Sequence, residues 1–320
     1  MWEICGHTLN TGEKKQVILE PNVPGYKMPA TLICGAGEGK TVLITAQIHS
    51  GEYPGTPAVI HMAKEIDPGK LCGNLVMIHC VNTSGFWAKS DARIPEDQVN
   101  LNADYPGKPD GSTGLRIADY FVKEIFPKVD FVCDLHSGGA TEPLTPCLFF
   151  PKAEKVTDAA RKAAMDLDIP NLIASWNQSG EVGYAAFHCD IPGLLLENGH
   201  SSKCEPEWVA FYEKNLRLLL AHLSMLPLEQ PLTICRKTVY EKAVYLEADV
   251  RGLWYPAVSE NMDIREGQYL GKVEDFFGNL LKEYYAEGDG KVFYYTSALA
   301  IRENDPLAAY GLSEFVVPEP

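Results

Sequence analysis

The chain of 320 residues lacks the features that identify membrane-spanning, disulfide-stabilised or nucleic-acid-binding proteins. No apolar run approaches the roughly 18 residues that a membrane span needs, and the N-terminus has no charged segment followed by an apolar one. Nine cysteines are scattered and never spaced as Cys-x-x-Cys, so we expect reduced core thiols. Lys and Arg number 28 against 43 Asp and Glu, and this net charge of −15 argues against nucleic acid or an anionic membrane as a partner. We therefore expect a cytoplasmic protein.

Apolar and helical patterns alternate along the first 235 residues. Several of the expected strands are continuous apolar runs, which is typical of strands buried on both faces of a sheet. The expected strands are 16–20, 30–34, 41–48, 74–80, 129–135, 147–150 and 193–197, and the expected helices are 56–66, 114–126, 155–168, 181–189 and 205–226. This alternation predicts an α/β sandwich with a mostly parallel or mixed sheet.

The pattern changes near residue 235. Short alternating segments such as 238–246 follow, separated by frequent glycines, and no long helical pattern is present after residue 236. Such spacing is typical of a small β-rich module. We therefore expect two domains, 1–235 and 236–320.

A histidine and a glutamate stand three positions apart where the apolar run 41–48 ends. His49 and Glu52 flank Ser50-Gly51, which indicates the start of a loop, so both side chains are expected where an α/β sheet opens to solvent. Imidazole nitrogens and carboxylate oxygens are both good Zn²⁺ ligands. The pair can supply two of the three protein ligands that a catalytic zinc needs.

A second apolar strand, 129–135, delivers another histidine just before a Gly-Gly break. His136 therefore repeats the context of His49 and is the expected third ligand. Asp134, two residues earlier, points to the same side of a regular strand and is a candidate for orienting a ligand imidazole. An ordinary polar strand residue is the alternative for Asp134.

A glutamate also ends the apolar strand 193–197. A hydrolytic zinc site needs a base that does not bind the metal, and Glu197 stands immediately before the loop Asn198-Gly199-His200. We expect Glu197 to be that base.

Four segments, in chain order, resemble the succinylglutamate desuccinylase and aspartoacylase family of the zinc carboxypeptidase clan. His49-Ser50-Gly51-Glu52 is similar to the family's His-x-x-Glu, Leu135-His136-Ser137 to its third-ligand segment, and Leu196-Glu197 to its catalytic glutamate. The segment Asn-Leu-Asn-Ala-Asp-Tyr-Pro-Gly at 100–107 is similar to the family's Asn-Leu-Asn-Arg followed by Pro-Gly. The resemblance covers most of the chain and implies a three-layer α/β sandwich with a mixed sheet, followed by a smaller β-rich domain.

The resemblance also implies one Zn²⁺ per chain, held by His49, Glu52 and His136, with Glu197 as general base. Arg93 stands where the family has an arginine that stabilises the negative charge on the tetrahedral oxygen. Asn102 falls in the segment that contributes to substrate binding.

One departure from the family pattern affects the substrate. Ala103 replaces an arginine that binds a substrate carboxylate through a bidentate contact. The substrate is therefore expected to lack a carboxylate there or to carry a cation that Asp104 could meet, unless another arginine substitutes. His200 and Tyr255 are further candidates for lining the site.

Three classes of function fit these residues. The favoured one is a zinc amidohydrolase that removes an acyl group from a small N-acylated amine or amino acid. A metallocarboxypeptidase acting on peptides is the second, and a non-catalytic metal-binding protein on the same scaffold is the third. A homo-oligomer is compatible with all three.

Overall fold

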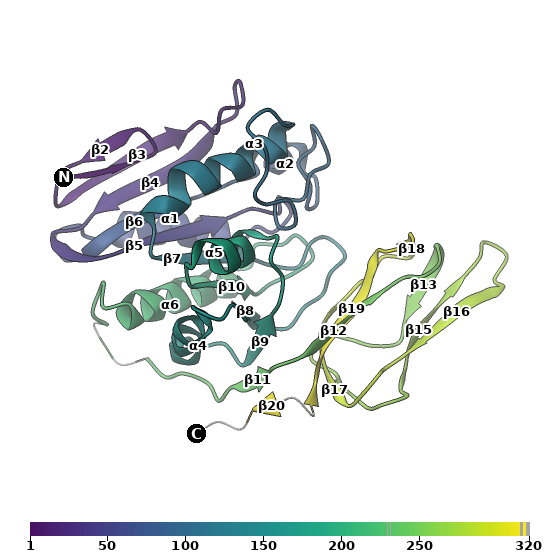
Figure 1. Ribbon diagram of the computed structural model, residues 1–320. Helices are drawn as coiled ribbons and strands as arrows, with labels where there is room; N and C mark the ends of the chain where they lie inside the picture. The colour runs from purple at the N-terminus through teal and green to yellow at the C-terminus, as the bar shows by residue number, and fades with distance from the viewer. Residues whose placement is uncertain (229, 231, 314–315, 318–320) are drawn as a thin grey trace.

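The computed structural model describes residues 1–228, 230, 232–313 and 316–317 (Figure 1). The strands before residue 235 are β1 (Trp2–Ile4), β2 (His7–Leu9), β3 (Glu13–Leu19), β4 (Met28–Cys34), β5 (Gly37–Ala46), β6 (Cys72–Ile78), β7 (Phe131–His136), β8 (Cys147–Pro151), β9 (Asn171–Ser175) and β10 (Gly193–Glu197). The helices are α1 (Gly55–Glu65), α2 (Thr83–Ala88), α3 (Thr113–Tyr120), the π-helical turn η1 (Phe121–Ile125), the 3-10 turn η2 (Phe126–Lys128), α4 (Thr157–Asp166), α5 (Glu181–Cys189) and α6 (Pro206–His222). None of the helices in the described ranges is long and apolar enough to cross a membrane.

A ten-stranded mixed sheet forms the centre of the molecule, in the order β20-β11-β9-β8-β10-β7-β5-β6-β4-β3. Its middle strands β10, β7 and β5 are neighbours and parallel, and Glu197 pairs in register with His136. Because parallel strands end at the same edge, the three strands deliver their carboxyl ends side by side. The predicted α/β sandwich with a mixed sheet is confirmed.

Two hydrophobic cores cover the two faces of this sheet. Alternation along β5 shows how they separate: Val42 and Ile44 belong to the core shared with α1, α4 and α6, whereas Leu43 faces the core shared with α3 and α5. The same alternation in β7 turns Val132 toward α5. The sandwich therefore has three layers, with the sheet between two layers that contain helices (Figure 1).

The expected helices and strands before residue 235 all form, with ends that differ by a few residues from the prediction. The largest difference concerns 114–126. There the α-helical part ends at Tyr120, and the chain goes on as the π-helical turn η1 and then the 3-10 turn η2. Pro127 explains the tight last turn, because proline cannot donate a backbone hydrogen bond within a longer helix. Strands β1, β2 and β9 and the short helix α2 were not predicted.

The C-terminal strands are β11 (Thr238–Tyr240), β12 (Ala243–Glu247), β13 (Gly252–Pro256), β14 (Asp263–Ile264), β15 (Tyr269–Glu274), β16 (Leu280–Tyr285), β17 (Gly290–Tyr295), β18 (Ala300–Ile301), β19 (Pro306–Leu312) and β20 (Val316–Val317). Strands β12 to β19 form two antiparallel four-stranded sheets around a core that contains Trp254 and Tyr310. This is the β-rich module expected from the sequence. Strands β11 and β20 instead extend the large sheet, through pairing of β11 with β9 and with β20.

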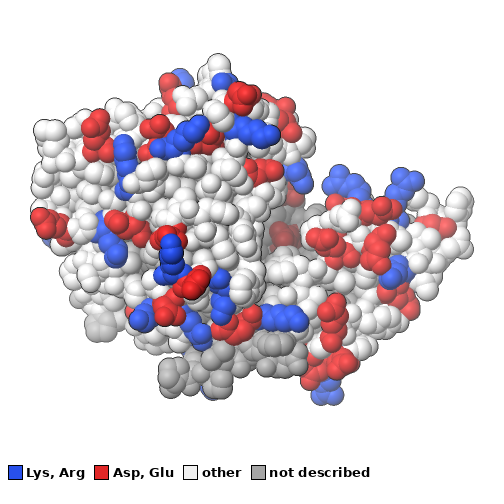
Figure 2. All heavy atoms as spheres, viewed as in Figure 1, with Lys and Arg blue, Asp and Glu red and all other residues white. Residues whose placement is uncertain are grey.

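The β-rich module packs against the segment that follows β7. Thr145 N donates to Phe293 O at 2.8 Å, and Leu144 forms an isolated β-bridge with Tyr294. Phe293 also packs with Cys147 and Tyr240 in a small shared core. Strand β17 is thereby joined to the loop beside the carboxyl ends of the central strands. Figure 2 shows the surface hollowed between the two parts of the chain, with acidic side chains at the margin of the hollow.

Candidate active site

The loop after β5 carries His49 and Glu52 at the carboxyl edge of the sheet. Gln47 has a positive φ of 61°, which turns the chain out of the strand, and its Nε2 donates to Glu52 O at 2.6 Å. Gly51 N donates to Asp91 O at 2.7 Å. These bonds hold the loop so that His49 Nδ1 lies 2.8 Å from Glu52 Oε1.

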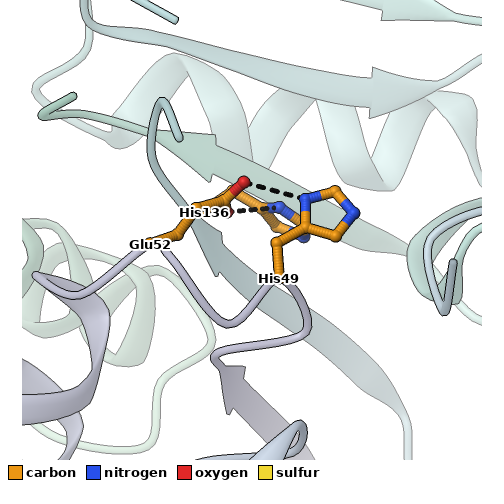
Figure 3. Close-up of side chains that lie close together, drawn as sticks. All are labelled: His49, Glu52 and His136. Carbon is orange, nitrogen blue, oxygen red and sulfur yellow. Dashed lines mark hydrogen bonds and ion pairs between the residues drawn. The ribbon is translucent and has the colours of Figure 1, made fainter. Parts of the chain in front are cut away.

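The third predicted ligand approaches the same carboxylate from β7. His136 Nδ1 lies 2.9 Å from Glu52 Oε2, so the carboxylate sits between the two imidazoles (Figure 3). The ligand atoms of His49, Glu52 and His136 lie within 4.8 Å of one another. The structure thus brings the three expected metal ligands together.

The outer nitrogen of each imidazole is held by another side chain. His49 Nε2 lies 2.9 Å from Asn100 Oδ1, and His136 Nε2 lies 2.7 Å from Asp134 Oδ2. Both rings therefore direct Nδ1 toward Glu52, which leaves two nitrogens and a carboxylate converging on one point. Two imidazole nitrogens and a carboxylate could hold a metal ion, and outer acceptors of this kind orient ligand imidazoles.

The charges at this point favour an ionised carboxylate. Burial opposes ionisation of Glu52, but His49 and His136 outweigh it and lower its pKa to about 2. Burial also disfavours a charged His136, yet Asp134 and Glu52 raise its pKa well above the usual value. A carboxylate that stays ionised is the form that binds a cation.

Glu197 ends β10 beside His136. Its Oε2 is buried and has no hydrogen-bond partner in the described part of the chain. Burial raises the pKa of Glu197 well above its usual value; nearby His136 lowers it, whereas Glu52 and Glu142 raise it further. The Glu197 carboxylate therefore lies in the same cavity as the cluster of His49, Glu52 and His136 without belonging to that cluster.

These side chains open into a cavity of about 390 Å³. Its walls combine polar side chains with apolar and aromatic ones. Among the described residues the lining comprises His49, Glu52, Asn102, His136, Glu142, Phe149, Phe150, Pro151, Ser175, Asn177, Val182, Gly183, Leu195, Glu197, Tyr245 and Tyr294. The lining contains no lysine or arginine.

Four of the expected site residues are not in this lining. Arg93 is exposed, and its guanidinium donates to Gln98 O at 2.8 Å. The Asp104 carboxylate accepts from Asn100 N at 3.0 Å, so it stabilises the turn that presents Asn100 to His49. His200 Nδ1 lies 2.8 Å from Ser201 Oγ, and Tyr255 is 39% exposed with the Lys272 ammonium over its ring. Of the expected substrate-binding residues, Asn102 alone lines the cavity.

Sequence reasoning missed Glu142, Tyr245 and Tyr294. The two tyrosines come from the β-rich module, whose position over the sheet edge could not be deduced from the order of short strands. Glu142 had a local signal, because Gly138-Gly139 permits a sharp turn after β7. A Cβ at Gly138 would overlap the Glu142 carbonyl oxygen, so glycine is what lets this segment fold back over the site.

Comparison with known proteins agrees with this geometry. Residues 38–223 match the family model described as the succinylglutamate desuccinylase/aspartoacylase catalytic domain. The chain is 28% identical over 279 residues to an N-alpha-acetyl-L-2,4-diaminobutyric acid deacetylase from Halomonas elongata, covering 82% of this chain and 79% of that protein.

Solved structures share the whole architecture, including the β-rich module. The product-bound ectoine utilization protein EutE (DoeB) from Ruegeria pomeroyi superposes with a TM-score of 0.79 and 25% identity, covering 90% of each chain. A succinylglutamate desuccinylase/aspartoacylase from Rhodobacter sphaeroides has a TM-score of 0.80 at 20% identity, covering 96% of this chain and 99% of that one. The family match extends over more than half of the chain and includes His49, Glu52, His136 and Glu197. The chain therefore belongs to the succinylglutamate desuccinylase/aspartoacylase family of deacylases.

Proposed function

We propose that the protein is a zinc-dependent amidohydrolase that removes an acyl group from a small N-acylated amine or amino acid. The observation that carries the proposal is the position of Glu197. It presents a buried, unpaired carboxylate oxygen to the same cavity as His49, Glu52 and His136. A metal-binding protein without catalysis has no need for such a base.

One zinc ion would be held by His49, Glu52 and His136, whose converging donors fit it. Bound there, zinc would polarise the amide carbonyl and lower the pKa of water to about 7. Glu197 would accept a proton from the attacking water and deliver it to the nitrogen of the leaving amine. Its raised pKa suits a carboxylate that must hold that proton between the two transfers. Arg93 is assigned no step, because its guanidinium bonds to Gln98 O outside the cavity.

The described lining of the cavity offers no lysine or arginine to bind a carboxylate at the end of a peptide. A peptide's terminal carboxylate is normally held by an arginine or lysine, and the described lining has neither. The Halomonas elongata relative is named for an acetylated diamino acid, whose amine part carries a second amino group. Both observations favour deacylation of a small N-acyl amine over a carboxypeptidase reaction.

The test combines metal content with turnover of matched substrates. The wild type and Glu197→Gln are assayed on N-acetylated amines, N-acetylated amino acids and short peptides with free carboxyl termini. We expect about one zinc per chain in both proteins and a loss of at least 100-fold in kcat for the variant on acylated amines. Retained turnover by the variant would contradict the assigned base. Preference for peptides would instead favour the carboxypeptidase.

A further inference from the structure

Glu142 is a carboxylate of the cavity wall that the proposed reaction does not use. It is not among the three clustered metal ligands, and Glu197 already occupies the position of the base. No described Lys or Arg forms an ion pair with it. Glu142 is partly exposed to the cavity, so a carboxylate that no lysine or arginine neutralises there can pair with a cation of the ligand.

The surroundings of Glu142 disfavour its ionised form while the cavity holds no cation. Burial raises its pKa to about 7, and the nearby Glu52 and Asp91 add to the shift, while His49 and a hydrogen bond from the Gly139 backbone act in the opposite direction. Three carboxylates, Glu52, Glu142 and Asp134, also raise the pKa of Glu197, and the His136 imidazole opposes them. The described lining therefore holds three carboxylates, Glu52, Glu142 and Glu197, and no lysine or arginine. Glu142 is the one that is neither in the metal-ligand cluster nor the proposed base, so it is available to a cation of the substrate.

Aromatic side chains complete the surroundings. Tyr294 and Tyr245 line the same cavity, and the charge of Glu142 adds to burial in raising the pKa of Tyr294 well above its usual value. A carboxylate combined with aromatic ring faces is a common setting for binding an organic ammonium group. The β-bridge between Leu144 and Tyr294 joins the segment that carries Glu142 to β17. It therefore fixes the position of Glu142 relative to Tyr294.

We propose that Glu142, together with Tyr294, binds a cationic amino group on the amine part of the substrate, so that the preferred substrates are mono-acylated diamines. This inference rests on the proposed deacylase function and names the substrate class of the same site. Glu142 is then a specificity-determining residue. The cation that Ala103 and Asp104 suggested from the sequence is met by Glu142 instead, since Asp104 is occupied in a turn.

Two substrates that differ only in the cation provide the test. Nα-acetyl-2,4-diaminobutyrate ends in an ammonium group, and Nα-acetylnorvaline carries a methyl group at that position. The wild type should prefer the first. Glu142→Gln should raise KM for the ammonium substrate at least tenfold, change KM for the norvaline substrate less than twofold and leave kcat within about threefold. Glu154→Gln, which removes one exposed carboxylate outside the cavity, should change neither KM.

A binding measurement separates failure of the subsite from failure of the proposed function. Calorimetric titration of the zinc-loaded proteins with 1,3-diaminopropane should show tighter binding to wild type than to Glu142→Gln, by at least tenfold. If the wild type hydrolyses no acyl amine but this difference holds, the proposed reaction fails and the cation subsite stands. The assignment to Glu142 is overturned if Glu142→Gln raises KM equally for both substrates. It is also overturned if wild type and Glu142→Gln bind the diamine equally tightly.

Discussion

The imidazole of His136 is held between two carboxylates, with Nε2 at 2.7 Å from Asp134 Oδ2 and Nδ1 at 2.9 Å from Glu52 Oε2. An acceptor at Nε2 keeps the proton there, so Nδ1 is the nitrogen available to a metal. Asp134 is fully buried on β7 and accepts a further bond from Thr45 Oγ1 at 3.0 Å. The two carboxylates therefore fix the orientation of the ring.

We expect Asp134→Asn to weaken zinc binding about 10- to 100-fold, because the amide can no longer act as a charged acceptor for His136 Nε2. Zinc affinity is measured by competition with a chelator of known affinity. Asp158→Asn, an exposed position in α4, is the control and should bind zinc as the wild type does. Unchanged affinity in Asp134→Asn would mean that the ring is positioned by packing alone.

A second buried carboxyl lies behind Asp134. Thr45 Oγ1 is 2.9 Å from Glu181 Oε1, and burial followed by the charge of Asp134 raises the pKa of Glu181 well above 4.5. The folded protein thus keeps the Glu181 carboxyl protonated at pH values where the unfolded chain has released that proton, which it does near pH 4.5. Because the unfolded state gains from this ionisation, the free energy of unfolding falls as pH rises above 4.5. Glu181→Gln removes the titration. We expect the free energy of unfolding of wild type to fall relative to the variant between pH 5 and 8, by up to about 1.4 kcal/mol per pH unit.

Urea unfolding of both proteins at pH 5, 6.5 and 8, in the same metal state, measures this difference. Glu154→Gln on the surface serves as control and should follow the wild type at each pH. Parallel pH profiles for wild type and Glu181→Gln would show that Glu181 is ionised in the folded protein.

The sequence predicted which side chains gather at the sheet edge, because three of them stand at or just after the end of an apolar strand. His49, His136 and Glu197 stand at the ends of runs whose burial is evident from composition, and parallel strands must end at one edge. Their convergence is a consequence of sheet topology, so position in the sequence was sufficient to predict that these side chains lie together.

Residues on irregular segments were harder to place. Arg93 and Asp104 lie in the long connection between β6 and α3, where local turns determine side-chain direction: Gln98 O binds one and Asn100 N the other. Tyr294 reaches the cavity through packing between β17 and residues near 144, a contact between segments about 150 residues apart. Neither turn geometry nor such distant packing follows from periodicity.

Removal of the metal should abolish activity and lower thermal stability. A ligand that binds only the folded state stabilises it in proportion to the logarithm of its concentration over its dissociation constant, about 2.7 kcal/mol at 100 times that constant. We therefore expect dialysis against a chelator to lower the melting temperature by several degrees, and zinc to restore both properties. His49→Ala should show no response to chelator, whereas His61→Ala on the exposed face of α1 should respond as wild type does. A melting temperature insensitive to chelator in wild type would contradict the metal site.

Asp168 fastens the segment that leads from α6 into β11. Its carboxylate accepts from Lys214 Nζ at 2.5 Å and from Cys235 N at 2.6 Å, which fastens the segment before β11 to α6. Burial opposes ionisation, but these two contacts lower the pKa of Asp168 below 3.8. Its contribution to stability is therefore fully present above about pH 4 and lost as pH falls further.

We expect Asp168→Asn to reduce the free energy of unfolding by about 1–2 kcal/mol at pH 7, because the bond from the ammonium group loses its charged acceptor. The difference from wild type should stay constant between pH 5 and 8 and narrow below pH 4, where the native carboxylate also becomes neutral. Asp166→Asn, two residues away and 60% exposed at its side chain, is the matched control and should cost less than about 0.5 kcal/mol. Equal losses in the two variants would mean that Asp168 contributes only surface charge, and that the segment before β11 is held by its pairing with β9.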